Sequence, residues 1–125
     1  MKLNVQPKFG NSPKKELLKK LTVHFASYEL EAVMEFLAEG VEWHLVGDAP
    51  IVGKYKFRAA LETMKHNKAR ELTILNIVTH GKEAAVNGEM HMQDGSVFGF
   101  ADFYHFASGR APLVQKIVSY VVEIK

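Results

Sequence analysis

The chain has 125 residues, no cysteine and a formal net charge of +2 at pH 7. We expect one domain over residues 1–125, because a chain of this length holds a hydrophobic core without disulfides. The lack of cysteine excludes thiolate metal sites, and the small net charge argues against a nucleic-acid partner. No apolar run is long enough to span a membrane, so we expect neither a membrane partner nor an export signal, and a cytoplasmic location.

The N-terminal part predicts an arm followed by an amphipathic helix. Residues 1–11 have no clear period and are expected to pair with another element or to fray. Ser12 and Pro13 are typical of a helix start, and the apolar face that follows includes His24 and Tyr28. Two interpretations of this histidine and tyrosine stay open: their polar tips reach into a cavity, or they lie at a core edge and bond to backbone or water.

A helix, a short strand and another helix are predicted next. Residues 29–38 have helical apolar spacing, and residues 41–46 alternate as Val-Glu-Trp-His-Leu-Val, which favours a strand. Trp43 and His44 then point to opposite faces. After a Gly-Asp-Ala-Pro loop, a third helix has Leu61 on its apolar face.

The second half of the chain changes to a period of two. This pattern predicts four strands, over residues 71–80, 83–94, 97–108 and 113–124. Their short connections, one of them Asp-Gly, indicate an antiparallel meander. The expected fold class is therefore α+β, with three N-terminal helices packed on the concave face of a curled antiparallel sheet.

One carboxylate interrupts an aromatic face of this sheet. In residues 98–106, Asp102 alternates onto the same face as four aromatic side chains, Phe98, Phe100, Tyr104 and Phe106. A carboxylate among such neighbours must be paired, hydrogen-bonded or neutral, and these are the conditions that produce an acid or base. The alternative is a partly wet face, on which Asp102 meets water or a backbone donor.

The preceding strand separates polar from apolar side chains. One face carries Asn87, Glu89 and His91, which we expect to be solvent-exposed rather than an acid/base or metal pair. The other face carries Val86, Met90 and Met92, with Gly88 as a gap that would leave room for a ligand.

Two stretches resemble a known family. VEWHLVGDAPIVGKYKFRAAL and the later ADFYHF are similar to the SnoaL-like and ketosteroid isomerase-like branch of the NTF2-like superfamily. The resemblance covers nearly the whole chain in element order and spacing. It implies a cone with one deep apolar pocket between the sheet and the helices, and commonly a dimer formed through the sheet.

The resemblance also implies roles for individual residues. The isomerase pattern has a catalytic aspartate on the short strand, where this chain has His44. Its Asp-x-x-x-Phe strand, which carries a protonated oxyanion-hole aspartate, is matched by Asp102 and Phe106. Its helical tyrosine is not matched, since the aligned region holds Leu21 and His24 and the next tyrosine comes a turn or more later. This departure argues against steroid isomerisation itself.

We therefore predict a small-molecule pocket with His44 as base and Asp102 as acid or hydrogen-bond donor. The expected ligand is a small apolar, carbonyl-bearing molecule, and the expected chemistry is proton transfer of isomerase, cyclase or dehydratase type without a cofactor or metal. The predicted ligand-binding residues are His24, Tyr28, Leu61, Val86, Met90, Phe98, Phe100, Tyr104 and Val121. Two alternatives stay open: a non-catalytic ligand-binding domain, and a structural dimer with a vestigial pocket.

A homodimer is the expected assembly. Alternation leaves a second apolar face on the sheet, larger than a monomer should expose. We assign to this face Leu72, Ile74, Val78, Val118, Tyr120 and Val122.

Overall fold

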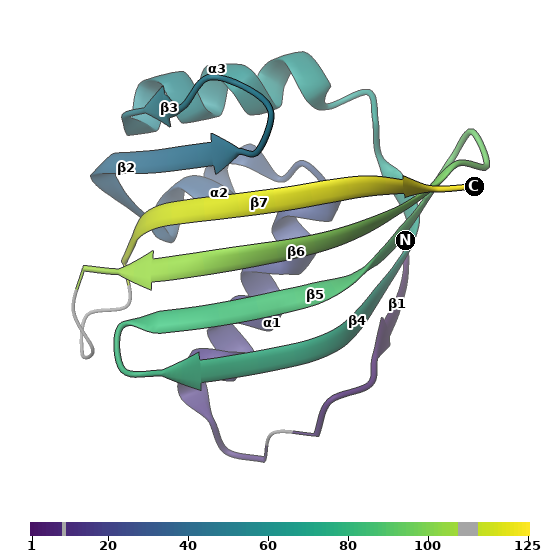
Figure 1. Cartoon of the computed structure of the whole chain (residues 1–125), viewed down its shortest axis with the longest axis horizontal. Helices are drawn as coiled ribbons and strands as arrows, with labels where there is room; N and C mark the ends of the chain where they lie inside the picture. The colour runs from purple at the N-terminus through teal and green to yellow at the C-terminus, as the bar shows by residue number, and fades with distance from the viewer. Residues whose placement is uncertain (9, 108–112) are drawn as a thin grey trace.

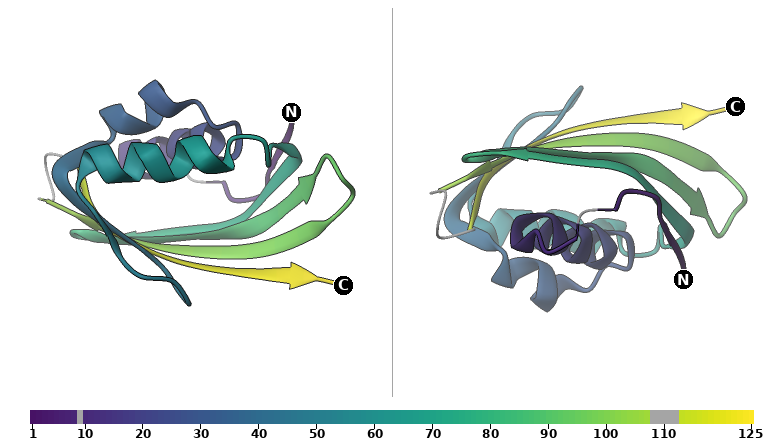
Figure 2. Two further views of the ribbon diagram at one scale, coloured as in Figure 1. Left: turned by 90° about the horizontal axis from the view of Figure 1, so that it is seen from above. Right: turned by 90° about the horizontal axis from the view of Figure 1, so that it is seen from below.

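Three helices cover one face of a curled seven-stranded sheet (Figures 1 and 2). The computed structural model describes residues 1–8, 10–107 and 113–125, so the last residue of the strand predicted over 97–108 and the connection to the next predicted strand lie outside the described residues. The helices are α1 (Pro13–Ala26), α2 (Leu30–Glu35) and α3 (Lys54–Met64). The strands are β1 (Lys2–Val5), β2 (Leu37–Leu45), β3 (Ile51–Val52), β4 (Ala69–His80), β5 (Glu83–Met92), β6 (Val97–Phe106) and β7 (Val114–Ile124).

The sheet is mixed, which corrects the prediction of an antiparallel sheet. Its order is β1-β4-β5-β6-β7-β2-β3, and the four long strands β4 to β7 form the predicted antiparallel meander. The N-terminal arm forms β1, parallel to β4, and β2 lies parallel to β7. Local patterns fix hairpins but not these partners, which come from distant parts of the chain. The helices do not all precede the sheet either, since β1, β2 and β3 lie among them in the sequence.

The start of α1 is as the sequence predicts, whereas α2 ends at Glu35 and not at residue 38, because β2 already begins at Leu37. The Ser12 hydroxyl accepts a hydrogen bond from the backbone N–H of Lys15, and Pro13 occupies the first turn of α1. Tyr28 does not extend α1. It follows the helix in the left-handed region, with φ of 51°, where glycine or asparagine is more usual. This conformation turns the chain sharply into α2 and fixes the position of the tyrosine ring.

The inner face of the sheet has two parts. At the closed end, Ala84, Val86, Tyr104, Phe106 and Val114 are buried in the core that α1 covers with Leu18 and Leu21. At the cavity end, Met90, Phe98 and Val121 remain partly or largely exposed. A bulge in β4 between Ile74 and Asn76 helps to curl the sheet around the helices. None of the helices within the described ranges is long and apolar enough to cross a membrane.

Gly88 does not leave a gap, contrary to prediction. A Cβ atom at this position would lie 2.1 Å from the carbonyl oxygen of Thr73 and 3.0 Å from the Phe100 ring. Glycine is therefore required because backbone and an aromatic ring already occupy the space above it. The room for a ligand lies further along the sheet.

Candidate functional site

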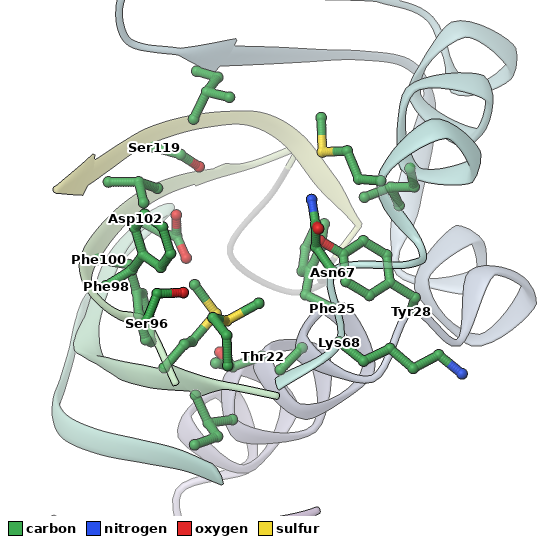
Figure 3. A pocket seen from close by; sticks show the side chains of 18 of the residues that line it. Thr22, Phe25, Tyr28, Asn67, Lys68, Ser96, Phe98, Phe100, Asp102 and Ser119 are labelled. Atoms are coloured by element: carbon green, nitrogen blue, oxygen red, sulfur yellow. The ribbon is translucent and has the colours of Figure 1, made fainter. Parts of the chain in front are cut away.

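A cavity of about 500 Å³ lies between the inner face of the sheet and the helices (Figure 3). Residues of α1, β2, α3 and β4 to β7 contribute to its wall. Most of this wall is made of aromatic, aliphatic and methionine side chains, including Phe25, Trp43, Leu61, Met90, Phe98 and Phe100. Such a surface favours an apolar ligand, and its few polar groups would fix the orientation of that ligand.

Asp102 is the carboxylate of the inner wall. It lies in the middle of β6, between Val86 on β5 and Ser119 on β7. Burial raises the pKa of Asp102 to about 6, and a hydrogen bond from the Ser119 hydroxyl limits this rise. A carboxyl group with a pKa of about 6 is present in both protonation states near neutral pH, which suits it to give or take a proton.

Ser119 connects Asp102 to the only tryptophan of the chain. The Trp43 indole Nε1–H donates to Ser119 Oγ over 3.0 Å, and both residues are buried. Trp43 is stacked on Phe57 with 4.8 Å between ring centroids. The polar part of the inner wall is therefore a row of three side chains, Trp43, Ser119 and Asp102, which come from three different strands. Phe57 of α3 packs against the Trp43 end of this row.

Tyr104 lies behind the cavity, two residues beyond Asp102 on the same strand face. Its side chain is 1% exposed, and its hydroxyl makes no hydrogen bond of normal geometry within the described parts of the chain, although the Thr22 hydroxyl lies near enough to limit the rise of its pKa. Burial raises the pKa of Tyr104 well above its ordinary value, and the neighbouring Asp102 charge adds to the effect. The hydroxyl is thus a neutral group held near the carboxylate.

A polar rim surrounds the exposed part of the cavity. The segment between α3 and β4 contributes His66, Asn67 and Lys68, and the β5–β6 hairpin contributes Asp94 and Ser96. The Ser96 hydroxyl donates to Asp94 over 2.5 Å, and this bond lowers the pKa of Asp94. In Figure 3 the ammonium end of Lys68 points away from the cavity, whereas the side chains of Asn67 and Ser96 lie toward it.

Seven of the predicted site residues line this cavity. Asp102 and six predicted ligand-binding residues contribute to its wall: Tyr28, Leu61, Met90, Phe98, Phe100 and Val121. They come from both layers, since Tyr28 and Leu61 belong to the helical side and the others to the sheet (Figure 3). Their contact with a ligand, and the catalytic role of Asp102, stay predictions.

His44 is not part of the cavity wall. Alternation along β2 turns Trp43 inward, whereas His44 pairs with Val118 on the outer face, with its Nε2 4.0 Å from Glu42. The predicted pairing of His44 with Asp102 is therefore corrected. The family resemblance placed a catalytic residue at this position, but the strand parity directs its side chain away from the cavity.

His24, Val86 and Tyr104 also lie off the cavity wall. His24 Nδ1 is 3.0 Å from the Glu29 carboxylate, and its ring packs 5.9 Å from that of Phe36. Val86 and Tyr104 are each 1% exposed, because α1 covers that end of the sheet. The corrections at Val86 and Tyr104 have one cause: periodicity predicts the face of a side chain but not what covers that face.

Sequence reasoning missed Trp43, Ser119 and Thr22, which line the cavity. The alternation of β2 already placed Trp43 opposite His44, so its inward position had a signal. Ser119 had a weaker one, as a small polar residue between apolar neighbours on a predicted strand. Within the described residues, no group of three or more His, Asp or Glu side chains has the geometry to hold a metal ion.

Solved structures share this fold. An NTF2-like protein of unknown function from Cytophaga hutchinsonii matches over 87% of this chain and 99% of its own, with 19% identity and a TM-score of 0.68. A putative ketosteroid isomerase from Kribbella flavida matches over 90% and 79%, with 19% identity and a TM-score of 0.72. SalBIII, an epoxide hydrolase/cyclase-like enzyme of pyran ring formation in salinomycin, matches over 87% and 90%, with 13% identity and a TM-score of 0.73. These identities establish similarity of fold alone.

The sequence comparison identifies the family. No curated protein matches the chain in sequence. The model of the SnoaL-like domain matches residues 19–112, a range that begins within α1 and includes all of β6. This match covers most of the chain and confirms the resemblance drawn from the sequence. The chain therefore belongs to the SnoaL-like domain family, and its fold is that of the NTF2-like proteins.

Proposed function

We propose that the cavity binds one small, mostly apolar molecule with a carbonyl or similar polar group, and that Asp102 exchanges a proton with it. The observation that carries this proposal is the carboxyl of Asp102 on the cavity wall, with its pKa raised to about 6 by burial. Such a group is basic enough to remove a proton activated by a carbonyl, and acidic enough to return it. The reaction class is proton transfer of the isomerase, cyclase or dehydratase type.

The proposal assigns the acid/base step to Asp102 alone. Of the two residues predicted as base and acid, only Asp102 lies on the cavity wall, because His44 faces the other side of the sheet. Removal and return of a proton by one carboxyl group fits a shift of a proton between two atoms of the same ligand. The apolar wall supports the same step, because it strengthens electrostatic interactions within the cavity.

Trp43 makes binding measurable without knowledge of the natural ligand. It is the only tryptophan and part of the cavity wall, so a bound apolar ketone should change its fluorescence. We expect bicyclic ketones such as 2-decalone to saturate this signal at one molecule per chain. Deuterium from the solvent should then replace hydrogen on the carbon next to the carbonyl of the bound ketone, and NMR can follow this exchange.

Asp102→Asn should keep binding and lower the deuterium exchange by roughly 10²–10⁴-fold, the usual contribution of a positioned acid or base. His44→Ala is the matched control and should leave exchange unchanged. Binding without exchange in the wild-type protein would contradict the catalytic proposal and favour a non-catalytic ligand-binding domain. Equal loss of exchange in both variants would contradict the assignment to Asp102.

We also propose a homodimer that forms through the outer face of the sheet. Val78, Phe103, Tyr120 and Val122 are 46–66% exposed on this face, and Phe103 and Tyr120 contact edge to face. Leu72 and Ile74, predicted for this face, are instead fully buried on the inner one. Light scattering at micromolar concentration should give twice the chain mass of 14.1 kDa, and Tyr120→Glu should give the monomer mass.

A further inference from the structure

Trp43 is held in one orientation. It is 7% exposed, stacks on Phe57 at 19° between ring planes, and has the Phe25 ring 6.1 Å away. An indole that is packed on two sides cannot turn its N–H elsewhere without losing these contacts. The direction of the Nε1–H bond toward Ser119 is therefore set by the aromatic cluster.

The Ser119 hydroxyl has one proton to donate, and its cross-strand neighbour is the carboxylate of Asp102. The indole N–H is a donor only, so Ser119 Oγ must accept from Trp43. The Ser119 hydroxyl proton is then free to bond to Asp102, its direct cross-strand neighbour. This arrangement runs from the Trp43 N–H, through the Ser119 hydroxyl, toward the carboxyl group of Asp102.

We propose that Trp43 and Ser119 are positioning residues for Asp102: they hold one carboxyl oxygen as a hydrogen-bond acceptor and leave the other to exchange a proton with the cavity. This inference deepens the proposed function and rests on it for its catalytic meaning. The Trp43–Ser119 hydrogen bond stands on the pairing of β2 with β7, and the step to Asp102 stands on the pairing of β7 with β6. Figure 3 shows the carboxyl group of Asp102 beside Ser119 on the sheet wall, with its oxygens toward the open space.

Other titratable groups face the same cavity from the elements around it. They are Tyr28 after α1, His66 between α3 and β4, and Asp94 in the β5–β6 hairpin, whereas the ammonium group of Lys68 points away from the cavity. Tyr104 lies behind Asp102 in the core. A test of the hydrogen-bond chain must therefore follow the Asp102 carboxyl carbon itself, not a global pH dependence.

The test is an NMR titration of the Asp102 carboxyl carbon in four proteins without ligand. Ser119→Ala should raise the Asp102 pKa above its wild-type value by roughly one unit, the effect of losing one charge-assisted hydrogen bond. Trp43→Phe keeps an aromatic ring on Phe57 but removes the N–H, and should raise the pKa by less. The double variant should match Ser119→Ala alone, because Trp43 acts through the serine hydroxyl.

Ser96→Ala is the matched control. This serine also lines the cavity, but its hydroxyl is bonded to Asp94, so its loss should raise the Asp94 pKa and leave Asp102 unchanged. Ser119→Thr keeps a hydroxyl on a strand and should restore the wild-type pKa of Asp102. If Trp43→Phe does not fold, Ser119→Ala and Ser119→Thr still test whether the Ser119 hydroxyl bonds to Asp102.

An unchanged Asp102 pKa in Ser119→Ala would overturn the inference and leave the proposed function intact. A Trp43→Phe effect of the same size with and without Ser119 would show that Trp43 acts by packing, and would also overturn it. The expected pKa shifts without deuterium exchange in a bound ketone would support the hydrogen-bond chain and contradict the proposed function. The two proposals therefore fail by different measurements.

Discussion

The two ends of the inner sheet face have the same sequence pattern and different structural roles. Along β6, Phe106 and Phe98 lie on the same face, yet Phe106 is 2% exposed at the closed end and Phe98 faces the cavity. The difference is made by α1, whose Leu18 and Leu21 fill one end. Its last turn instead contributes Phe25 and Ala26 to the cavity wall. The cavity is thus the part of the inner face against which the helices do not pack directly.

The largest expected effect is on stability, and it tests the difference between the two ends of the inner face directly. Phe106→Ala should lower the free energy of unfolding by about 3–5 kcal/mol, because it opens a void in a filled core. Phe98→Ala removes the same side chain from the same strand face, where open space already exists, and should cost about 1 kcal/mol or less. Urea denaturation measures both.

The effects of the two variants on ligand binding should have the opposite order to their effects on stability. Phe98→Ala should weaken ketone binding, and Phe106→Ala should leave it unchanged wherever the protein is folded. Equal destabilisation by the two variants would mean that the cavity end is as tightly packed as the closed end.

A smaller effect follows from the ionisation of Asp102 at the cavity end. Its pKa is about 6 in the folded chain and 3.8 as the ordinary value, so ionisation is harder in the folded state. The stability linked to this group is complete below pH 3.8 and is lost as the pH rises through 6. The loss is on the order of 3 kcal/mol, since each pKa unit corresponds to about 1.4 kcal/mol.

Asp102→Asn cannot ionise and should remove this loss. Compared with the wild type, the variant should gain stability between pH 4 and pH 8 and show little difference at pH 4. Because all other groups titrate in both proteins, the difference between their urea midpoints isolates Asp102. A difference that stays constant across this pH range would show that the carboxyl group is ionised as easily in the folded chain as in the unfolded one.

Local patterns predicted the parts of this molecule that depend on neighbours in the sequence. The Ser12 cap, the meander of β4 to β7 and the inward face of Asp102 all follow from spacing over a few residues. The strand parity even placed Trp43 and His44 on opposite faces. The error at His44 came from giving the family pattern more weight than this alternation.

The remaining features depend on contacts between distant residues. Trp43 and Ser119 are 76 residues apart, and their hydrogen bond exists only because β2 lies beside β7. The parallel pairing of β1 with β4 has the same character. The alternation of their strands placed Val86 and Tyr104 on the pocket face, but periodicity does not show how far along the sheet α1 packs. The candidate carboxylate was therefore predictable, whereas its hydrogen-bond partner and the limits of the cavity were not.

The smallest expected effect compares two hydroxyl groups, one at each end of the inner face. Tyr104 Oη is buried beside the Thr22 hydroxyl but makes no hydrogen bond of normal geometry in the described structure, so Tyr104→Phe removes a group that costs free energy to bury. We expect this variant to change the free energy of unfolding by less than about 1 kcal/mol, in the stabilising direction. Ser119→Ala should instead destabilise by about 1–2 kcal/mol, because it leaves the Trp43 N–H without its acceptor. Both measurements use urea denaturation at pH 5, where Asp102 is largely protonated and its charge contributes little to the difference. A destabilisation by Tyr104→Phe as large as that by Ser119→Ala would mean that the tyrosine hydroxyl has a partner in solution, and that the polar groups around Asp102 extend into the closed end.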